Sequence, residues 1–122
     1  MVDDFRFEKI NADSVKINGT EFKLEKGSEK YSDYDEEEKR WNVKIYFTVI
    51  HPQYTGPPME QGMRPNSYLN DIYIAELIFS DGTSGKFKMG HYARSYDPFT
   101  KVDATKFRAI EVDPNTPISD KP

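Results

Sequence analysis

The amino-acid sequence predicts an all-β fold, an antiparallel β-sandwich or flattened barrel of about seven strands. Apolar residues alternate with polar ones along much of the chain, which is the period of a strand with one buried face. Glycine, proline, asparagine and aspartate fall between these runs, where turns are expected. Aromatic residues make up 14% of the chain and all apolar residues only 36%, so a few large side chains must supply much of the buried area.

The first predicted strands lie before the acidic part of the chain. Phe5 to Ile10 is a weak strand, and Asn18-Gly19 is a dipeptide typical of a two-residue hairpin turn. A turn at that dipeptide puts the apolar residues of both flanking strands on one face. The residues expected on that face are Val15, Ile17, Thr20, Phe22 and Leu24.

The segment Glu25 to Arg40 is acidic and is predicted to be solvated. Its run of Asp33, Asp35 and Glu36 to Glu38 has neither the spacing nor the glycine of an EF-hand calcium loop. A loop or a single helical turn, with Ser32 and Asp35 as its capping box, is expected instead.

Two strong strands follow, and they differ in how they are covered. Trp41 to Val49 alternates apolar with polar residues, as a half-buried strand does. The run Ile72 to Phe79 is apolar on both faces, because Ile72, Ile74 and Ile78 lie opposite its main apolar set. Such a strand is central, covered by another element, or part of an interface. One expectation is therefore a homo-oligomer formed through Ile72 to Phe79.

The turn SDGTSG predicts a second hairpin. Its loop should have an odd number of residues, because only then do Leu77, Ala75 and Tyr73 face Phe87, Met89 and His91. A weaker final strand covers Lys106 to Val112. A bulge is expected in it, because Phe107 and Ala109 break parity with Ile110 and Val112.

We expect one β domain over residues 1–112 and a disordered or loosely packed C-terminal tail over residues 113–122. The tail has three prolines and few apolar groups. Chain length, strand number and loop placement are generic to immunoglobulin-like and fibronectin-like sandwiches, so that general architecture is predicted. The Cys, Trp, Cys framework of true immunoglobulin domains is absent, because the chain has no cysteine.

The most informative stretch for function is the eighteen-residue segment His51 to Tyr68, which holds four of the eight prolines and two of the four methionines. Connections this long inside a compact domain are usually binding loops, lids or disordered insertions. If sequential strands run antiparallel, this segment lies at the same end as a second loop, His91 to Asp103, and opposite the acidic segment. One end of the domain is then aromatic and proline-rich.

Tyrosine, methionine and arginine are enriched at protein interfaces, and prolines lower the entropy lost when a loop becomes ordered. We therefore predict a binding surface made of the two loops. The alternative is that their aromatic side chains fold back and close the open end of the core. The predicted binding residues are Tyr54, Met59, Met63, Arg64, Tyr68, Tyr92, Arg94, Tyr96 and Phe99.

The two histidines, His51 and His91, fall at strand ends on this same side. Two imidazoles and a carboxylate can bind zinc or non-haem iron, which makes them weak candidates for a metal site. Their spacing matches no known ligand motif, and a histidine that bonds a loop carbonyl is far commoner. We therefore predict no metal and no cofactor.

The function expected from the sequence is that of a non-enzymatic protein-binding module, with a protein partner. The alternatives are a carbohydrate-binding module, a structural or assembly subunit, and, least favoured, a small metal-dependent enzyme. Nucleic acid is not expected as a partner, because 21 acidic and 17 basic residues give a net charge of -4. No membrane contact and a cytoplasmic location are expected, because the chain has no membrane-length apolar run and begins without signal-peptide features.

Overall fold

The computed structural model describes residues 5–51, 72–97, 99–100 and 102–119. Within these residues the chain forms one eight-stranded sheet in which all pairings are antiparallel. The prediction of an all-β antiparallel fold is confirmed. No helix among the described residues is long and apolar enough to cross a membrane. The strands are β1 (Phe5–Lys9), β2 (Ser14–Ile17), β3 (Thr20–Leu24), β4 (Glu29–Asp35), β5 (Arg40–Ile50), β6 (Ile74–Phe79), β7 (Ser84–Asp97) and β8 (Val102–Glu111).

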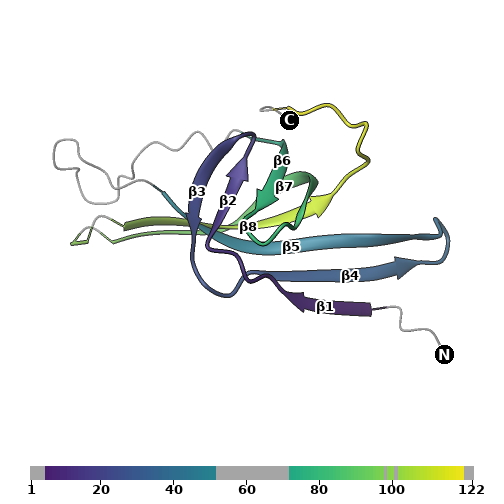
Figure 1. Ribbon diagram of the computed structural model, residues 1–122, viewed down its shortest axis with the longest axis horizontal. Helices are drawn as coiled ribbons and strands as arrows, with labels where there is room; N and C mark the ends of the chain where they lie inside the picture. Colours follow the sequence, from purple (N-terminus) through teal and green to yellow (C-terminus); the bar gives the residue numbers. More distant parts are fainter. Residues whose placement is uncertain (1–4, 52–71, 98, 101, 120–122) are drawn as a thin grey trace.

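Six strands close into a barrel. Hydrogen-bonded neighbours follow the order β5, β3, β2, β6, β7 and β8, and β8 pairs again with β5. Figure 1 shows β2 and β3 crossing above the long ribbons of β5 and β8. Closure gives each barrel strand a partner on both sides and so removes open edges. The predicted immunoglobulin-like or fibronectin-like arrangement is not confirmed by this strand order.

An arm extends from the barrel and consists of β1, β4 and the first half of β5. β4 pairs with β5 from Glu29↔Tyr46 to Asp35↔Arg40, and β1 pairs with the other edge of β4. The remainder of that edge of β5 pairs with β3, through Val49 and Ile50. In Figure 1 the turn between β4 and β5 lies at the opposite end of the molecule from the turn between β7 and β8.

The arm corrects the interpretation of the acidic segment as a loop or helical turn. Residues 29–35 form β4, and its tyrosines pack on the rings of neighbouring strands: Tyr31 on Tyr46, and Tyr34 on Trp41. Asp35 does not begin a helix. Its Oδ1 accepts hydrogen bonds from the backbone N–H groups of Glu37 (2.9 Å) and Glu38 (3.1 Å), which orders the turn between β4 and β5.

The first predicted hairpin is confirmed. Ile17 lies opposite Thr20, and Asn18 and Gly19 have φ values of 50° and 87°, as a two-residue turn of this kind requires. Thr20 is exposed, whereas the other four residues expected on the apolar face are buried. Those four are Val15, Ile17, Phe22 and Leu24.

Aromatic side chains from three strands fill the centre of the barrel. The ring of Phe47 packs edge to face on Phe79 at 5.4 Å and stacks on Phe107 at 5.5 Å. All three rings are fully buried, and so are Ile45 and Val49 on the same face of β5. The predicted alternation along β5 is therefore confirmed from Ile45 onward, whereas residues 41–44, in the arm, are all half-buried.

The β6–β7 hairpin has the predicted odd parity, but the predicted pairs are wrong by two residues, because the loop is shorter than expected. Phe79 N donates to Thr83 O, so residues 80–82 form an odd-numbered loop. Ala75 lies directly opposite Phe87 and Leu77 opposite Gly85, with the apolar residues of both strands on the buried face.

The bulge expected in the last strand is in its neighbour instead. β8 pairs regularly with β5, with Thr105, Phe107 and Ala109 on the buried face and Ile110 half-buried on the other. The register shifts in β7, between His91 and Ala93.

The segment after β8 runs back over β6 and β7. The Nζ atom of Lys86 donates to the carbonyl oxygens of Pro114 (2.8 Å) and Thr116 (2.7 Å). Ser119 forms an isolated antiparallel bridge with Ile74. The division into one domain and a loosely packed tail stays a prediction.

Candidate functional site

The ends of β7 and β8 form a hairpin, called the projecting hairpin and defined here as residues 93–97 and 102–106 (Figure 1). Its base, Ala104 to Lys106, still pairs with β5, and its tip extends past the last residues that β5 pairs with. The predicted loop from His91 to Asp103 is therefore wrong in its conformation. Its two sides satisfy their backbone hydrogen-bonding groups by pairing with each other. His51 N donates to Asp103 O at 2.8 Å, so the first residue of the proline-rich segment lies at the base of this hairpin, and the rest of that segment lies outside the described residues.

The bulge sets which residues of the projecting hairpin share a face. His91 lies opposite Phe107, but Ala93 lies opposite Lys106 and Arg94 opposite Thr105. One extra residue on β7 exchanges the faces of the strand, because strand side chains alternate with a period of two. Beyond the bulge, Arg94 and Tyr96 thus take the register positions opposite the buried residues Thr105 and Asp103.

The described residues at the tip of the projecting hairpin bond to Asp97 and include exposed apolar side chains. Asp97 Oδ1 accepts hydrogen bonds from the backbone N–H groups of Phe99 (2.9 Å) and Thr100 (3.4 Å). The bond from Phe99 is the main reason that the pKa of Asp97 is lowered, since it stabilises the carboxylate. Phe99 is 94% exposed and Val102 43% exposed, so two apolar side chains face solvent at this end.

Buried polar groups lie at the base of the projecting hairpin. His51, Asp103 and Thr105 are all buried, and the His51 Nε2 atom lies 2.7 Å from Thr105 Oγ1. This hydrogen bond ties the end of β5 to β8 and matches the common role of a histidine at a strand end. The described residues contain no group of three His, Cys, Asp or Glu side chains that could hold a metal. The side chain of His91 lies outside the described part.

The structure describes only some of the predicted binding residues. Tyr96 is half-buried opposite Asp103, and Phe99 is exposed at the turn. Tyr92 and Arg94 belong to β7, but their side chains lie outside the described part. The remaining predicted residues lie outside the described residues altogether; they are Tyr54, Met59, Met63, Arg64 and Tyr68.

A second surface, which the sequence interpretation did not include, covers the outer face of the arm. Four rings from three strands form an aromatic row: Phe5 and Phe7 lie 6.1 Å and 5.1 Å from Tyr31, which lies 5.5 Å from Tyr46. The alternation of Phe5 with Phe7 was a usable signal. Its partner Tyr31 was missed because the acidic residues around it indicated a loop.

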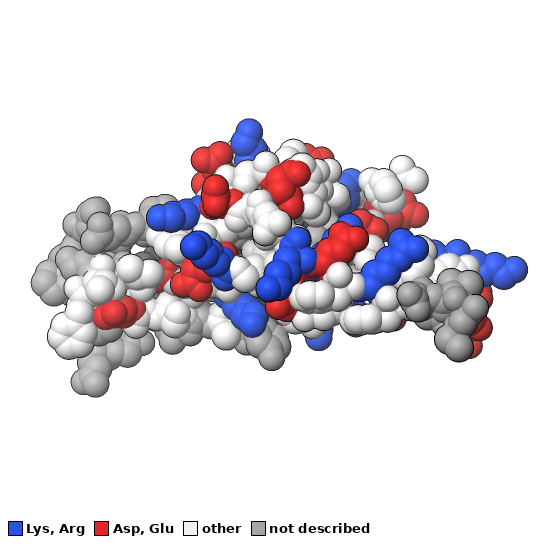
Figure 2. Space-filling view, turned by 60° about the horizontal axis from the view of Figure 1, so that its bottom comes forward, with Lys and Arg blue, Asp and Glu red and all other residues white. Residues whose placement is uncertain are grey.

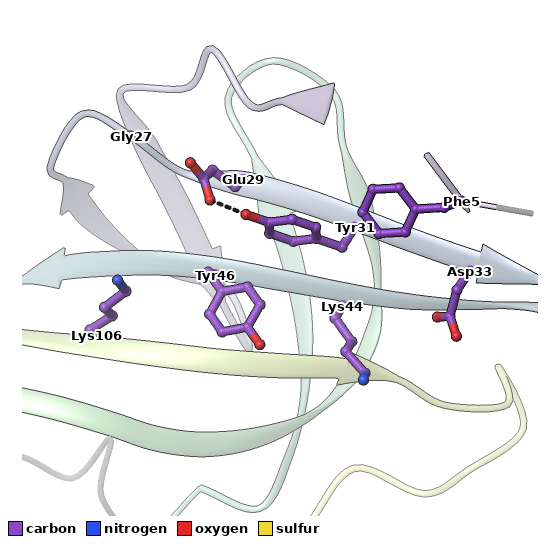
Figure 3. A pocket seen from close by; sticks show the side chains of 8 residues that line it. All are labelled: Phe5, Gly27, Glu29, Tyr31, Asp33, Lys44, Tyr46 and Lys106. Atoms are coloured by element: carbon purple, nitrogen blue, oxygen red, sulfur yellow. Dashed lines mark hydrogen bonds between the residues drawn. The ribbon is translucent and has the colours of Figure 1, made fainter. Parts of the chain in front are cut away.

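Part of the aromatic row lines a shallow groove of about 610 Å³ (Figure 3). Tyr31 Oη donates a hydrogen bond to Glu29 Oε2 at 2.6 Å, and this bond is the main reason that the pKa of Tyr31 is raised. Both signs of charge border the groove, and Figure 2 shows basic and acidic side chains interspersed over the molecular face that it draws. The lining residues are Phe5, Gly27, Glu29, Tyr31, Asp33, Lys44, Tyr46 and Lys106.

The isoleucines of the strand predicted to form an oligomer contact have separate environments. Ile72 is buried in the core cluster, and Ile74 is half-buried and bridged to Ser119. Ile78 is 43% exposed on the outer face. An oligomer formed through Ile72 to Phe79 stays a prediction.

The geometry of these surfaces is the basis for assigning a function, because comparison with protein-family models, curated proteins and solved structures found no match for this chain.

Proposed function

We propose that this chain is a non-enzymatic protein-binding module, and that the projecting hairpin provides its main contact. The single observation that supports this assignment is the side chain of Phe99, which is 94% exposed at the tip of the hairpin while its backbone N–H group donates to Asp97. Burying one such side chain against a partner contributes about 1.5–3 kcal/mol. Isolated exposed apolar residues are common, so the hydrogen-bonded backbone is what makes this one favourable for binding.

Three hydrogen bonds involve the backbone close to Phe99. Asp97 accepts two backbone hydrogen bonds, and Val102 N donates to Thr100 Oγ1 at 3.4 Å across the same turn. A backbone that is already hydrogen-bonded loses less conformational entropy on binding, which leaves more of the contact energy for affinity. Tyrosine and arginine residues assigned to this end from the sequence would extend the contact.

The test compares Phe99→Ala with Phe5→Ala. Both replace an exposed phenylalanine, but Phe5 lies on the arm, away from the projecting hairpin. Immobilised protein is used to capture partners from a lysate of the native source, and the captured proteins are identified by mass spectrometry. We expect Phe99→Ala to lose the specific partner, Phe5→Ala to retain it, and both variants to keep the thermal stability of the parent. Capture by Phe99→Ala at the parental level would contradict the assignment.

A carbohydrate-binding module is the second candidate, and the groove on the arm favours it. Tyrosine rings can stack on sugar rings, and the groove places Tyr31 and Tyr46 beside carboxylates and ammonium groups that can bond hydroxyls. The same pair of variants separates the candidates, because Phe5 lines the groove. If Phe5→Ala alone loses binding, the binding site is the groove on the arm and not the projecting hairpin.

A further inference from the structure

Among the described strands, β1 is the outermost one of the sheet, and one of its edges has no partner strand. It is first in the strand order, and among the described strands it pairs with β4 alone. All of its residues are exposed, including Phe5 at 59% and Phe7 at 45%. An open edge presents unpaired backbone groups to any further strand, and natural proteins usually protect it with proline, bulges or charge. β1 contains no proline, and Phe5 and Phe7 alternate with Arg6 and Glu8 before the strand ends at Lys9.

The two faces of β1 have different chemistry. Phe5 and Phe7 lie on the outer face, where they contact Tyr31 of β4. Arg6 and Glu8 take the alternate positions and so lie on the opposite face. There the Arg6 guanidinium lies 4.4 Å from the centre of the Trp41 ring.

We propose that β1 pairs antiparallel with β1 of a second copy of this chain, around a two-fold axis beside Phe7. Phe7 would then lie opposite Phe7 of the partner subunit. On the other face, Arg6 would lie opposite Glu8 of the partner subunit, and the same pair would recur on the other side of the axis. The three strands of each arm would form one continuous sheet across the dimer.

Charge complementarity favours a second copy of this chain as the partner of β1, and it also favours one register of the two strands. A two-fold axis normal to the sheet keeps each side chain on its own face, so two directly opposed residues must belong to the same face. This is the case only when the axis passes beside a residue and not between two residues. An axis beside Arg6 would oppose two arginines, and an axis beside Glu8 would oppose two glutamates. Directly opposed like charges destabilise a strand pair, whereas opposite charges and aromatic pairs stabilise it. The axis beside Phe7 gives both favourable pairs and opposes all five residues of β1, whereas an axis beside Phe5 or Lys9 would oppose only that end residue within the strand.

The outer face supports the same register. Phe7 already lies 5.1 Å from Tyr31, which lies 5.5 Å from Tyr46, so the aromatic row would run through both copies without interruption. Phe5 would lie opposite Lys9 of the partner subunit, which places an ammonium group beside an aromatic ring. Exposed aromatic area at the edge would thereby become interface.

Disulfide formation tests the register directly, because the chain has no cysteine of its own. The variant Phe7→Cys would place two thiols on directly opposed positions, close enough to form a bond under mild oxidation. Phe5→Cys is the matched control, because its thiol would be about 13 Å along the strand from its counterpart. We expect a covalent dimer from Phe7→Cys and none from Phe5→Cys. The reverse result, or no dimer from either variant, would overturn the proposal.

Charge reversal tests whether the strand that pairs with β1 is β1 of a second copy. Arg6→Glu and Glu8→Arg should each lose concentration-dependent dimerisation in sedimentation velocity, because each opposes like charges in its own dimer. An equal mixture of the two variants should recover a dimer containing one copy of each, which also shows that both are folded. Lys26→Glu, an exposed change outside β1, is the control and should dimerise as the parent does. A parent that stays monomeric at every concentration, or dimers that persist in both single variants, would contradict pairing through β1.

Discussion

Tyr31 belongs both to the aromatic row and to a hydrogen bond with Glu29, and the two roles act on the same side chain. The hydroxyl donates to the Glu29 carboxylate, and removing the proton would put two negative charges 2.6 Å apart. The pKa of Tyr31 is therefore raised, first by this bond, then by desolvation and by the charges of Glu29 and Tyr46. A raised pKa in the folded state means that the stability from this pair is fully present below the unfolded pKa of about 10, and is lost as pH rises through the folded pKa.

We predict that Glu29→Gln lowers the pKa of Tyr31 toward its ordinary value, because the amide carries no charge and accepts a weaker hydrogen bond. NMR titration with ¹³C-labelled tyrosine follows this residue separately from the other seven of the eight tyrosines. Glu25→Gln, an exposed change outside the aromatic row, should leave the pKa of Tyr31 as it is. An unchanged pKa in Glu29→Gln would show that the hydrogen bond is not the main cause.

Local backbone preferences could be predicted residue by residue, whereas contacts between distant residues could not. Asn18-Gly19 predicts its own turn because both residues tolerate the positive φ that the turn needs. Tyr31 gives no comparable signal. Its partners come from strands that are distant in the sequence, and the acidic residues beside it have low strand propensity.

At the scale of elements, β4 and the projecting hairpin show where hydrophobic patterning stops being informative. One face of β5 and one face of β6 line the barrel, and both strands were predicted: β5 from its alternation, and β6 from an apolar run that covers both faces. β4 lies in the arm and none of its residues is fully buried, so its sequence has no apolar face to detect. The bulge in β7 reverses the alternation partway along the strand, which made residues 91–97 resemble a loop.

Lys86 holds the segment after β8 to the rest of the fold, and we predict that Lys86→Met releases it. The methionine keeps most of the aliphatic stem but cannot donate to Pro114 O or Thr116 O. Hydrogen exchange should become faster at Ser119, whose N–H group donates to Ile74 O at 3.1 Å. Lys88→Met is the matched control on the same strand, because the Lys88 ammonium group lies over the ring of Tyr73. Equal protection of Ser119 in all three proteins would show that Lys86 does not fix this segment.

At the scale of the whole molecule, stability depends on a few aromatic side chains that meet at the centre of the barrel. Phe47 of β5 contacts the aromatic rings of Phe79 on β6 and Phe107 on β8. β8 is a hydrogen-bonded neighbour of β5 and β6 is not, so these contacts connect strands that are apart in the barrel. The all-β class and the aromatic core could be predicted from composition and period. The closure of the barrel and the presence of an arm could not, because both depend on which strands pair.

We predict that Phe47→Ala lowers the free energy of unfolding by about 3–5 kcal/mol, as expected for a large cavity in a packed core. Phe47→Leu fills more of that space and should cost less. Urea denaturation followed by circular dichroism measures both losses. Phe99→Ala is the control and should shift the free energy of unfolding by no more than about 0.5 kcal/mol, because its ring contacts mainly solvent. Similar losses at both positions would contradict the assignment of Phe47 to the core.

β5 is one continuous strand that serves two structures in succession. Its residues 40–46 pair with β4, and its residues 44–50 pair with β8. The two pairings therefore overlap on three residues, 44–46. The arm therefore has no hinge where it leaves the barrel. Any force or restraint applied to the arm by a binding partner passes along an unbroken backbone into the barrel wall, and local opening of the arm exposes the same residues that close the barrel.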